Sequence, residues 1–158
     1  MRRPAKGISL PHDNLLPRDT RRALPIALLR ARESVMARFR PILHARDLTE
    51  QQWRVLRVLG EESPLAAAEV SRRACVMGPS LTRIIKALQK RMLILRGPDA
   101  GDGRKVKLAI APAGGALIRE IAPDVRAVYA ELENRFGRNR IDDLLDILDD
   151  FVGWANRG

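Results

Sequence analysis

The stretch from Met77 to Leu95 carries hydroxyl and cationic side chains at helical spacing. Its sequence is MGPSLTRIIKALQKRMLIL, and Gly78-Pro79 opens a helix because proline is tolerated at the first helical position. Apolar residues then recur three and four positions apart, which predicts one buried face made of Leu81, Ile84, Ile85 and Leu88. The opposite face carries the polar side chains of Ser80, Thr82, Arg83 and Lys86.

Such a polar face fits two interpretations. Hydroxyl and guanidinium groups near the N-terminus of a helix are the groups that contact base edges and phosphates in DNA. A solvated amphipathic helix would carry the same cations only for solubility. The helix alone does not decide between them, so the decision depends on the segments around it.

The composition favours one mainly helical domain with a polyanionic partner. The chain has 158 residues, of which 46% are hydrophobic and 4% aromatic, and its formal charge is +10. Residues 66–107 hold ten lysines and arginines against three acids, a local charge of +7. Residues 138–158 hold three arginines against five aspartates, a local charge of −2. This asymmetry indicates one basic surface, for which nucleic acid is a better partner than a membrane.

Enzymatic chemistry is not indicated. The chain has two histidines and one cysteine and lacks a convergent acid cluster, so we find no triad, no metal site and no cofactor motif. Cys75, the single cysteine, cannot form an intrachain disulfide, and we expect it to be buried as a small apolar residue. Because no apolar run is long enough to span a membrane and the N-terminus lacks an apolar core of a signal peptide, we expect a cytoplasmic protein.

The N-terminal half of the chain divides into an arm and several helices. Residues 1–19 contain three prolines and no periodicity, which predicts a flexible basic arm. A long helix is predicted from Thr20 to about residue 46. Thr49 and Gln52 form a capping box at the start of a second helix, and a short third helix is predicted over residues 66–74. With the helix that opens at Gly78-Pro79, this third helix makes a helix-turn-helix.

A basic hairpin follows directly. The runs LILRG and KVKLAI flank the turn residues of PDAGDGR, so we predict two strands and a tip. A helix-turn-helix followed by a hairpin is a winged helix, and Arg104 at the wing tip suits the minor groove of DNA. Asp102 is either an ordinary turn residue or an acceptor that fixes a neighbouring arginine.

Two long helices complete the chain, one from Pro112 to about Phe136 and one that ends near residue 156. Their apolar faces exceed what a small DNA-binding lobe needs, which indicates a homodimer interface built from both chain ends. We therefore predict a single domain over residues 20–158. Its dimerisation helices cover about residues 20–46 and 112–156, and its DNA-binding lobe covers about residues 49–111. A two-fold dimer would match a palindromic operator in double-stranded DNA.

This order of parts resembles the MarR family of bacterial transcriptional regulators. The resemblance covers Leu24 to Val152, and its most specific pieces are PSLTRIIKALQKRMLILR and the wing stretch DGRKVKLAIAPAG. Ala111 departs from the family pattern, in which a threonine often caps the next helix. The segments ALLRARESVMARFRPIL and LTEQQWRVLRVL resemble the subgroup that represses operons for breaking down homoprotocatechuate, or 3,4-dihydroxyphenylacetate.

The resemblance implies a homodimeric winged-helix repressor that a small aromatic acid releases from DNA. By position, it assigns DNA contacts to Ser80, Thr82, Arg83, Lys86 and Arg104, with phosphates within reach of Arg72 or Arg73. It also places the ligand site between the dimerisation helices and the DNA-binding lobe. An aromatic carboxylate needs a cation and an apolar wall there, which Arg32, Arg40, His44 and Trp53 can supply.

Other interpretations of these residues stay open. Trp53 also fits a place in the core, and Arg32 and Arg40 also fit ion pairs with Glu33 and Glu50. Some regulators of this family sense oxidants through a cysteine, which would give Cys75 a redox role. A less specific DNA-binding architectural protein is the further alternative, although it would carry basic charge on many faces.

Overall fold

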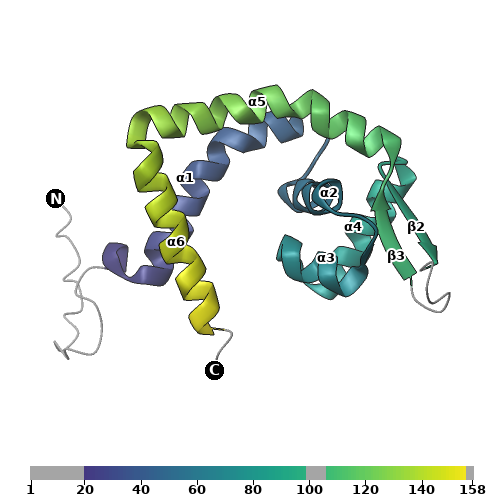
Figure 1. Ribbon diagram of the computed structural model, residues 1–158, viewed down its shortest axis with the longest axis horizontal. Helices are drawn as coiled ribbons and strands as arrows, with labels where there is room; N and C mark the ends of the chain where they lie inside the picture. The colour runs from purple at the N-terminus through teal and green to yellow at the C-terminus, as the bar shows by residue number, and fades with distance from the viewer. Residues whose placement is uncertain (1–19, 99–105, 156–158) are drawn as a thin grey trace, which may run out of the picture. The chain divides into compact units, whose positions relative to one another are not determined.

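A computed structural model of the protein describes residues 20–98 and 106–155 (Figure 1). The chain divides into two compact units, residues 1–37 and 38–158. The first unit contains a 3-10 turn, Thr20–Arg22, and the N-terminal part of helix α1, which spans Leu24–His44. The helix thus begins after the predicted Thr20. Pro25 explains this boundary because a residue without an N–H group fits only the first turn of a helix.

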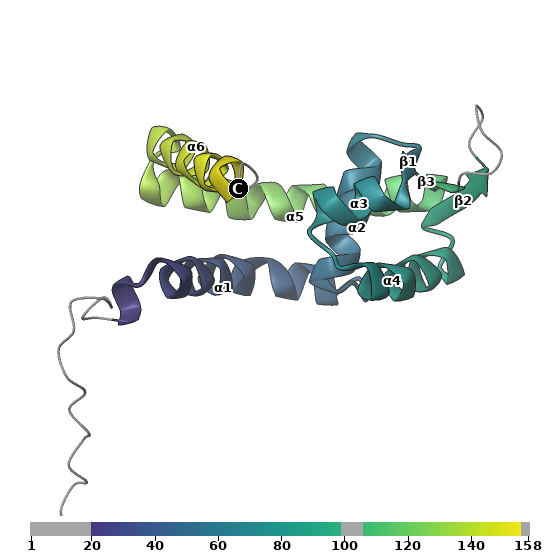
Figure 2. The same ribbon diagram turned by 90° about the horizontal axis from the view of Figure 1, so that it is seen from below.

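The second unit is mainly helical with a small antiparallel sheet, as predicted. Its described residues form the helices α2 (Glu50–Glu61), α3 (Ala67–Ala74), α4 (Gly78–Lys90), α5 (Pro112–Phe136) and α6 (Arg138–Ala155). They also form the strands β1 (Leu65–Ala66), β2 (Ile94–Pro98) and β3 (Val106–Ile110). Figures 1 and 2 show α2, α3 and α4 gathered beside the sheet, while α5 runs away from it.

Local signals set several of these boundaries. The predicted capping box is confirmed: the Gln52 N–H donates to Thr49 Oγ1 at 3.2 Å, and the Thr49 N–H donates to Gln52 Oε1 at 3.0 Å. Gly137 lies between α5 and α6 with φ at +84°, a conformation that favours glycine. Ala111 caps α5 without a side-chain hydrogen bond, as the missing threonine predicts.

The sheet has the strand order β1-β3-β2, and both pairings are antiparallel. The predicted hairpin is confirmed as β2 and β3, in which Arg96 lies opposite Leu108. The prediction missed β1, where Leu65 pairs with Leu108, and it wrongly placed Ala66 in the third helix. Two residues carry too little periodicity to predict a strand, because β1 exists only through its pairing with β3. The expected wing tip, with Asp102 and Arg104, lies outside the described residues.

One hydrophobic core holds the second unit together. Its fully buried side chains come from the end of α1, the turn after α1, helices α2 to α5 and the sheet. They include Leu43, Leu48, Leu56, Leu59, Val70, Leu88, Leu108 and Ile121. Helix α6 turns off at the far end of α5 and buries none of its residues in the single chain (Figure 1). Its apolar side chains therefore remain available for burial against another surface.

The start of α5 lies against the chain between α4 and β2. The Ala111 N–H donates a hydrogen bond to the Leu93 carbonyl oxygen at 3.0 Å. A Cβ atom added at Gly114 would lie 2.1 Å from the same oxygen, so only glycine fits this close approach. This contact fixes the first turn of α5 beside the base of the hairpin.

Candidate nucleic-acid interface

Helix α4 divides its side chains as the sequence predicts. Leu81, Ile84, Ile85 and Leu88 are buried in the core. On the other side Thr82, Arg83 and Lys86 are exposed, and Ser80 is half-buried. The buried stripe fixes the rotation of the helix about its axis, so the polar set is presented to solvent. Such a helix can place hydroxyl and guanidinium groups in a major groove.

The first turn of α4 lacks a side-chain cap. Met77 is the N-cap residue and makes no side-chain hydrogen bond to the helix, while Pro79 lies in the first turn. The Thr82 hydroxyl donates to the Gly78 carbonyl oxygen at 3.3 Å, which leaves the oxygen of Thr82 able to accept. The N-terminal end of this helix therefore presents backbone N–H groups and short polar side chains together.

The turn between α3 and α4 corrects one prediction. Cys75 is exposed, whereas we expected it to be buried. Its φ of +49° lies in the left-handed region, where the chain reverses after α3. Its N–H bonds back to α3, and Val76 takes the buried place, where its carbonyl oxygen accepts from the Ser71 hydroxyl. The apolar position was therefore assigned one residue too early.

The two arginines of α3 are held by acids. The Arg72 guanidinium donates to both oxygens of Glu69, at 2.6 and 3.1 Å. This hydrogen bonding lowers the pKa of Glu69 and raises the pKa of Arg72, so both groups stay charged. Arg73 pairs with Glu62 at 2.6 Å and is half-buried. A phosphate contact by either arginine must therefore compete with a carboxylate already present.

The hairpin places further cations beside α4. Arg96 on β2 is exposed, and Lys107 on β3 is half-buried. They line a surface hollow of about 380 Å³ together with Pro64, Leu95, Gly97, Pro98 and Ala109. The predicted contact at Arg104 falls outside the described residues, so it stays a prediction.

The predicted ligand residues lie in both units. In the first unit, Arg32 pairs with Glu33 at 2.7 Å. In the second unit Arg40 pairs with Glu50, which begins α2 one turn before Trp53. The Trp53 ring is half-buried against the core. His44 is exposed at the last residue of α1, one turn beyond Arg40.

Arg54, which lies on α2, is not among the site residues predicted from the sequence. The Nε atom of Arg54 is buried and has no hydrogen-bond partner among the described residues. A buried guanidinium N–H without an acceptor is costly, so this group is suited to receive a carboxylate or carbonyl oxygen. One weak signal for it exists in the sequence, since Arg54 stands directly between two apolar residues, Trp53 and Val55.

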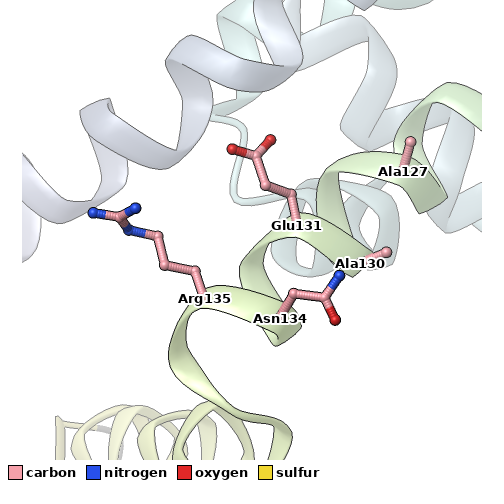
Figure 3. A pocket seen from close by; sticks show the side chains of 5 residues that line it. All are labelled: Ala127, Ala130, Glu131, Asn134 and Arg135. Carbon is pink, nitrogen blue, oxygen red and sulfur yellow. The ribbon is translucent and has the colours of Figure 1, made fainter.

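A larger surface hollow lies elsewhere, on α5. It has a volume of about 610 Å³ and is lined by Ala127, Ala130, Glu131, Asn134 and Arg135 (Figure 3). None of the four predicted ligand residues lines it, and Glu131 is paired with Arg38. In residues 20–98 and 106–155, no cluster of three or more potential ligands could hold a metal ion. Within those residues no helix is long and apolar enough to cross a membrane.

Comparisons with known proteins agree with this geometry. The sequence profile of the MarR family matches residues 48–106. The homoprotocatechuate degradative operon repressor of Escherichia coli is 35% identical over 134 residues, which cover 85% of this chain and 90% of the relative. The transcriptional regulator FarR of Neisseria gonorrhoeae is 37% identical over 126 residues, covering 80% of this chain and 86% of the relative.

A solved structure shows the same fold over nearly its whole length. The crystal structure of NadR in complex with 4-hydroxyphenylacetate superposes with a TM-score of 0.77 at 33% identity. The match covers 85% of this chain and 98% of the NadR chain. The shared fold, the helix-turn-helix with its hairpin and the full-length relatives lead to one conclusion: this chain belongs to the MarR family.

Proposed function

We propose that this protein is a homodimeric repressor that binds a palindromic operator and leaves it when a small aromatic acid binds. The observation that carries the proposal is the exposed polar face of α4 beside a basic hairpin, on a chain whose relative represses an aromatic degradation operon. The protein acts in the cytoplasm, where an operator is accessible. Its relatives are transcriptional regulators, which supports a role in regulation and not in catalysis.

In this proposal α4 supplies the base contacts. Thr82, Arg83 and Lys86 are exposed on one side of the helix, and Ser80 is near its N-terminus. Arginine recognises guanine through two hydrogen bonds, and lysine is suited to a phosphate. Arg104 serves the minor groove from the wing, while Arg72 and Arg73 serve the backbone after they release their carboxylates.

The dimer supplies the spacing of the two α4 helices. Helix α6 exposes Leu144, Leu145, Ile147, Phe151, Val152 and Trp154 in the single chain. Burial of this set against a second copy of the chain removes a large apolar surface from water. The two-fold symmetry of such a dimer presents two identical recognition helices to successive major grooves.

The effector is an aromatic carboxylate. The NadR structure contains 4-hydroxyphenylacetate, and the E. coli relative controls homoprotocatechuate degradation. In this chain Arg40 and Arg54 are the cations of the second unit suited to the carboxylate, and Trp53 supplies an apolar wall for the ring. His44 completes the proposed set of the second unit from the end of α1, and a ligand contact by Arg32 of the first unit stays a prediction.

A titration on the protein's own promoter tests this function. We expect specific binding that 3,4-dihydroxyphenylacetate or 4-hydroxyphenylacetate weakens, while the uncharged amide of either acid has no effect. Arg40→Met or Arg54→Met should bind the promoter normally and respond less to the acid. The control Arg126→Met removes an exposed cation of α5 outside this set. Equal binding to random DNA would instead support an architectural protein, and a normal response in both variants would displace the proposed effector site.

Redox control is a second candidate because Cys75 is exposed rather than buried. It lies in the turn directly before α4, so oxidation there would alter the approach of the recognition helix. The same titration with peroxide in place of the acid tests it. Release that Cys75→Ser abolishes would support this candidate, and peroxide-resistant binding would exclude it.

A further inference from the structure

An arginine directly after α4 ties the recognition helix to a distant turn. The Arg91 guanidinium donates from Nη1 to the Asp47 carbonyl oxygen at 2.6 Å and from Nη2 to the Arg46 carbonyl oxygen at 3.0 Å. Both oxygens belong to the turn that follows α1, where Asp47 has a φ of +52°. Carbonyl groups beyond a helix C-terminus carry partial negative charge, so these are charge-assisted hydrogen bonds to fixed backbone atoms.

The same turn is tied to α5 by a second arginine. The side chain of Arg46 contacts Glu120 at 3.1 Å and Asp124 at 3.3 Å, and it is 26% exposed. Leu43 and Leu48 on either side of the turn are buried. The turn therefore cannot move independently of the core, and it links the end of α4 to the middle of α5.

This link differs in kind from the packing of α4. Apolar contacts are non-directional, so the buried stripe holds α4 by the fit of its side chains and not by individually directed bonds. Two hydrogen bonds to backbone oxygens, at 2.6 and 3.0 Å, fix both a distance and a direction. Because α5 leads into α6, the exposed apolar helix of the proposed dimer interface, the link connects the end of α4 with the elements of that interface.

We infer that Arg91 is a positioning residue for operator recognition, which sets the separation of the two recognition helices by holding α4 to the Arg46 turn. The inference rests on the proposed function. Arg91 acts here without touching a base or a phosphate. A direct phosphate contact by Arg91 is the rival explanation, and the two differ in their dependence on operator geometry.

The experiment measures affinity for three DNAs, the native operator and two versions with one base pair inserted or deleted between the half-sites. Wild-type protein should prefer native spacing. In Arg91→Gln, affinity for the native operator should fall about five- to tenfold while affinity for the altered operators changes less, so the preference narrows. The salt dependence should keep its slope, because no phosphate contact is lost. Arg91→Lys, which retains a charged donor, should restore part of the preference.

Two further variants complete the test. Lys90→Gln removes the same charge one residue earlier, without the two carbonyl contacts, and should keep the spacing preference. The double variant Glu120→Gln/Asp124→Asn releases the turn from α5 and should narrow the preference as Arg91→Gln does. A thermal melt of each variant at one protein concentration shows whether the variant is still folded. A folded variant with a narrowed spacing preference has then changed the position of α4 and not the stability of the fold.

Three other outcomes would overturn the positioning role of Arg91. An equal loss on all three DNAs, with a slope reduced by about one, would make Arg91 a phosphate contact and overturn the inference. An undiminished spacing preference in Arg91→Gln would overturn the inference alone and leave the proposed function standing. Wild-type protein that binds the three DNAs equally would overturn the proposed function, and this inference with it.

Discussion

Replacement of Gly114 by alanine tests the contact that joins α5 to the base of the hairpin. The added Cβ atom would lie 2.1 Å from the Leu93 carbonyl oxygen, and 2.8 Å from the Ile110 Cδ1 atom. The isoleucine methyl group can rotate away, but the carbonyl oxygen belongs to the backbone. The first turn of α5 must therefore move by about one ångström, and overpacking of this kind costs roughly 1–3 kcal/mol.

The movement also affects a hydrogen bond. The Ala111 N–H donates to the same Leu93 oxygen at 3.0 Å, and its loss costs about 1 kcal/mol. The higher helix propensity of alanine offsets this by up to about 1 kcal/mol. We therefore expect Gly114→Ala to lower the free energy of unfolding by roughly 1–3 kcal/mol.

The next residue provides a matched control. Gly115 also lies in the first turn of α5, but a Cβ atom there would meet only the Arg119 Nη1 atom at 3.5 Å, an ordinary contact. Gly115→Ala should raise the free energy of unfolding by about 0.5–1 kcal/mol through helix propensity alone. Urea unfolding at one fixed protomer concentration measures both variants, because dimerisation makes stability depend on concentration. Equal stability of the two variants would refute the close approach at Leu93.

Three other substitutions test the proposed DNA contacts and the proposed dimer interface. Arg83→Ala should weaken specific operator binding by roughly 1–3 kcal/mol and leave binding to random DNA nearly unchanged, and equal losses on both DNAs would refute a base contact. Glu69→Gln should free Arg72 for a phosphate and steepen the salt dependence of log Kd by about 0.9, and an unchanged slope would show that Arg72 does not reach DNA. Leu145→Glu places a charge on the exposed apolar face of α6 and should give a monomer in sedimentation at micromolar concentration, whereas a stable dimer would place the interface elsewhere.

Local sequence signals predicted much of this fold. The capping box of Thr49 and Gln52 and the Gly78-Pro79 opening each act within a few residues, so their effects can be inferred from the sequence alone. The buried stripe of α4 follows from helical periodicity for the same reason. Because the polar face proposed to contact DNA is the side opposite that stripe, helical periodicity predicts its orientation as well.

Features that depend on distant partners could not be predicted. Strand β1 exists because Leu65 meets Leu108, and the Arg91 hydrogen bonds join residues 44 and 45 positions apart. The error at Cys75 has a different origin, since a left-handed residue moves the apolar position to Val76. Such a φ value is uncommon outside glycine, asparagine and aspartate, so a helical pattern cannot anticipate it.

In the proposed dimer, the apolar face of α6 would make the amount of protein in the cell a control variable. A lone protomer exposes Leu144, Leu145 and Phe151 and carries only one copy of α4, so it could not span the two half-sites of the proposed operator. Below the dissociation constant of the dimer, the concentration of active repressor rises with the square of the protomer concentration. A twofold change in gene dosage would then change the active repressor about fourfold, independently of any effector.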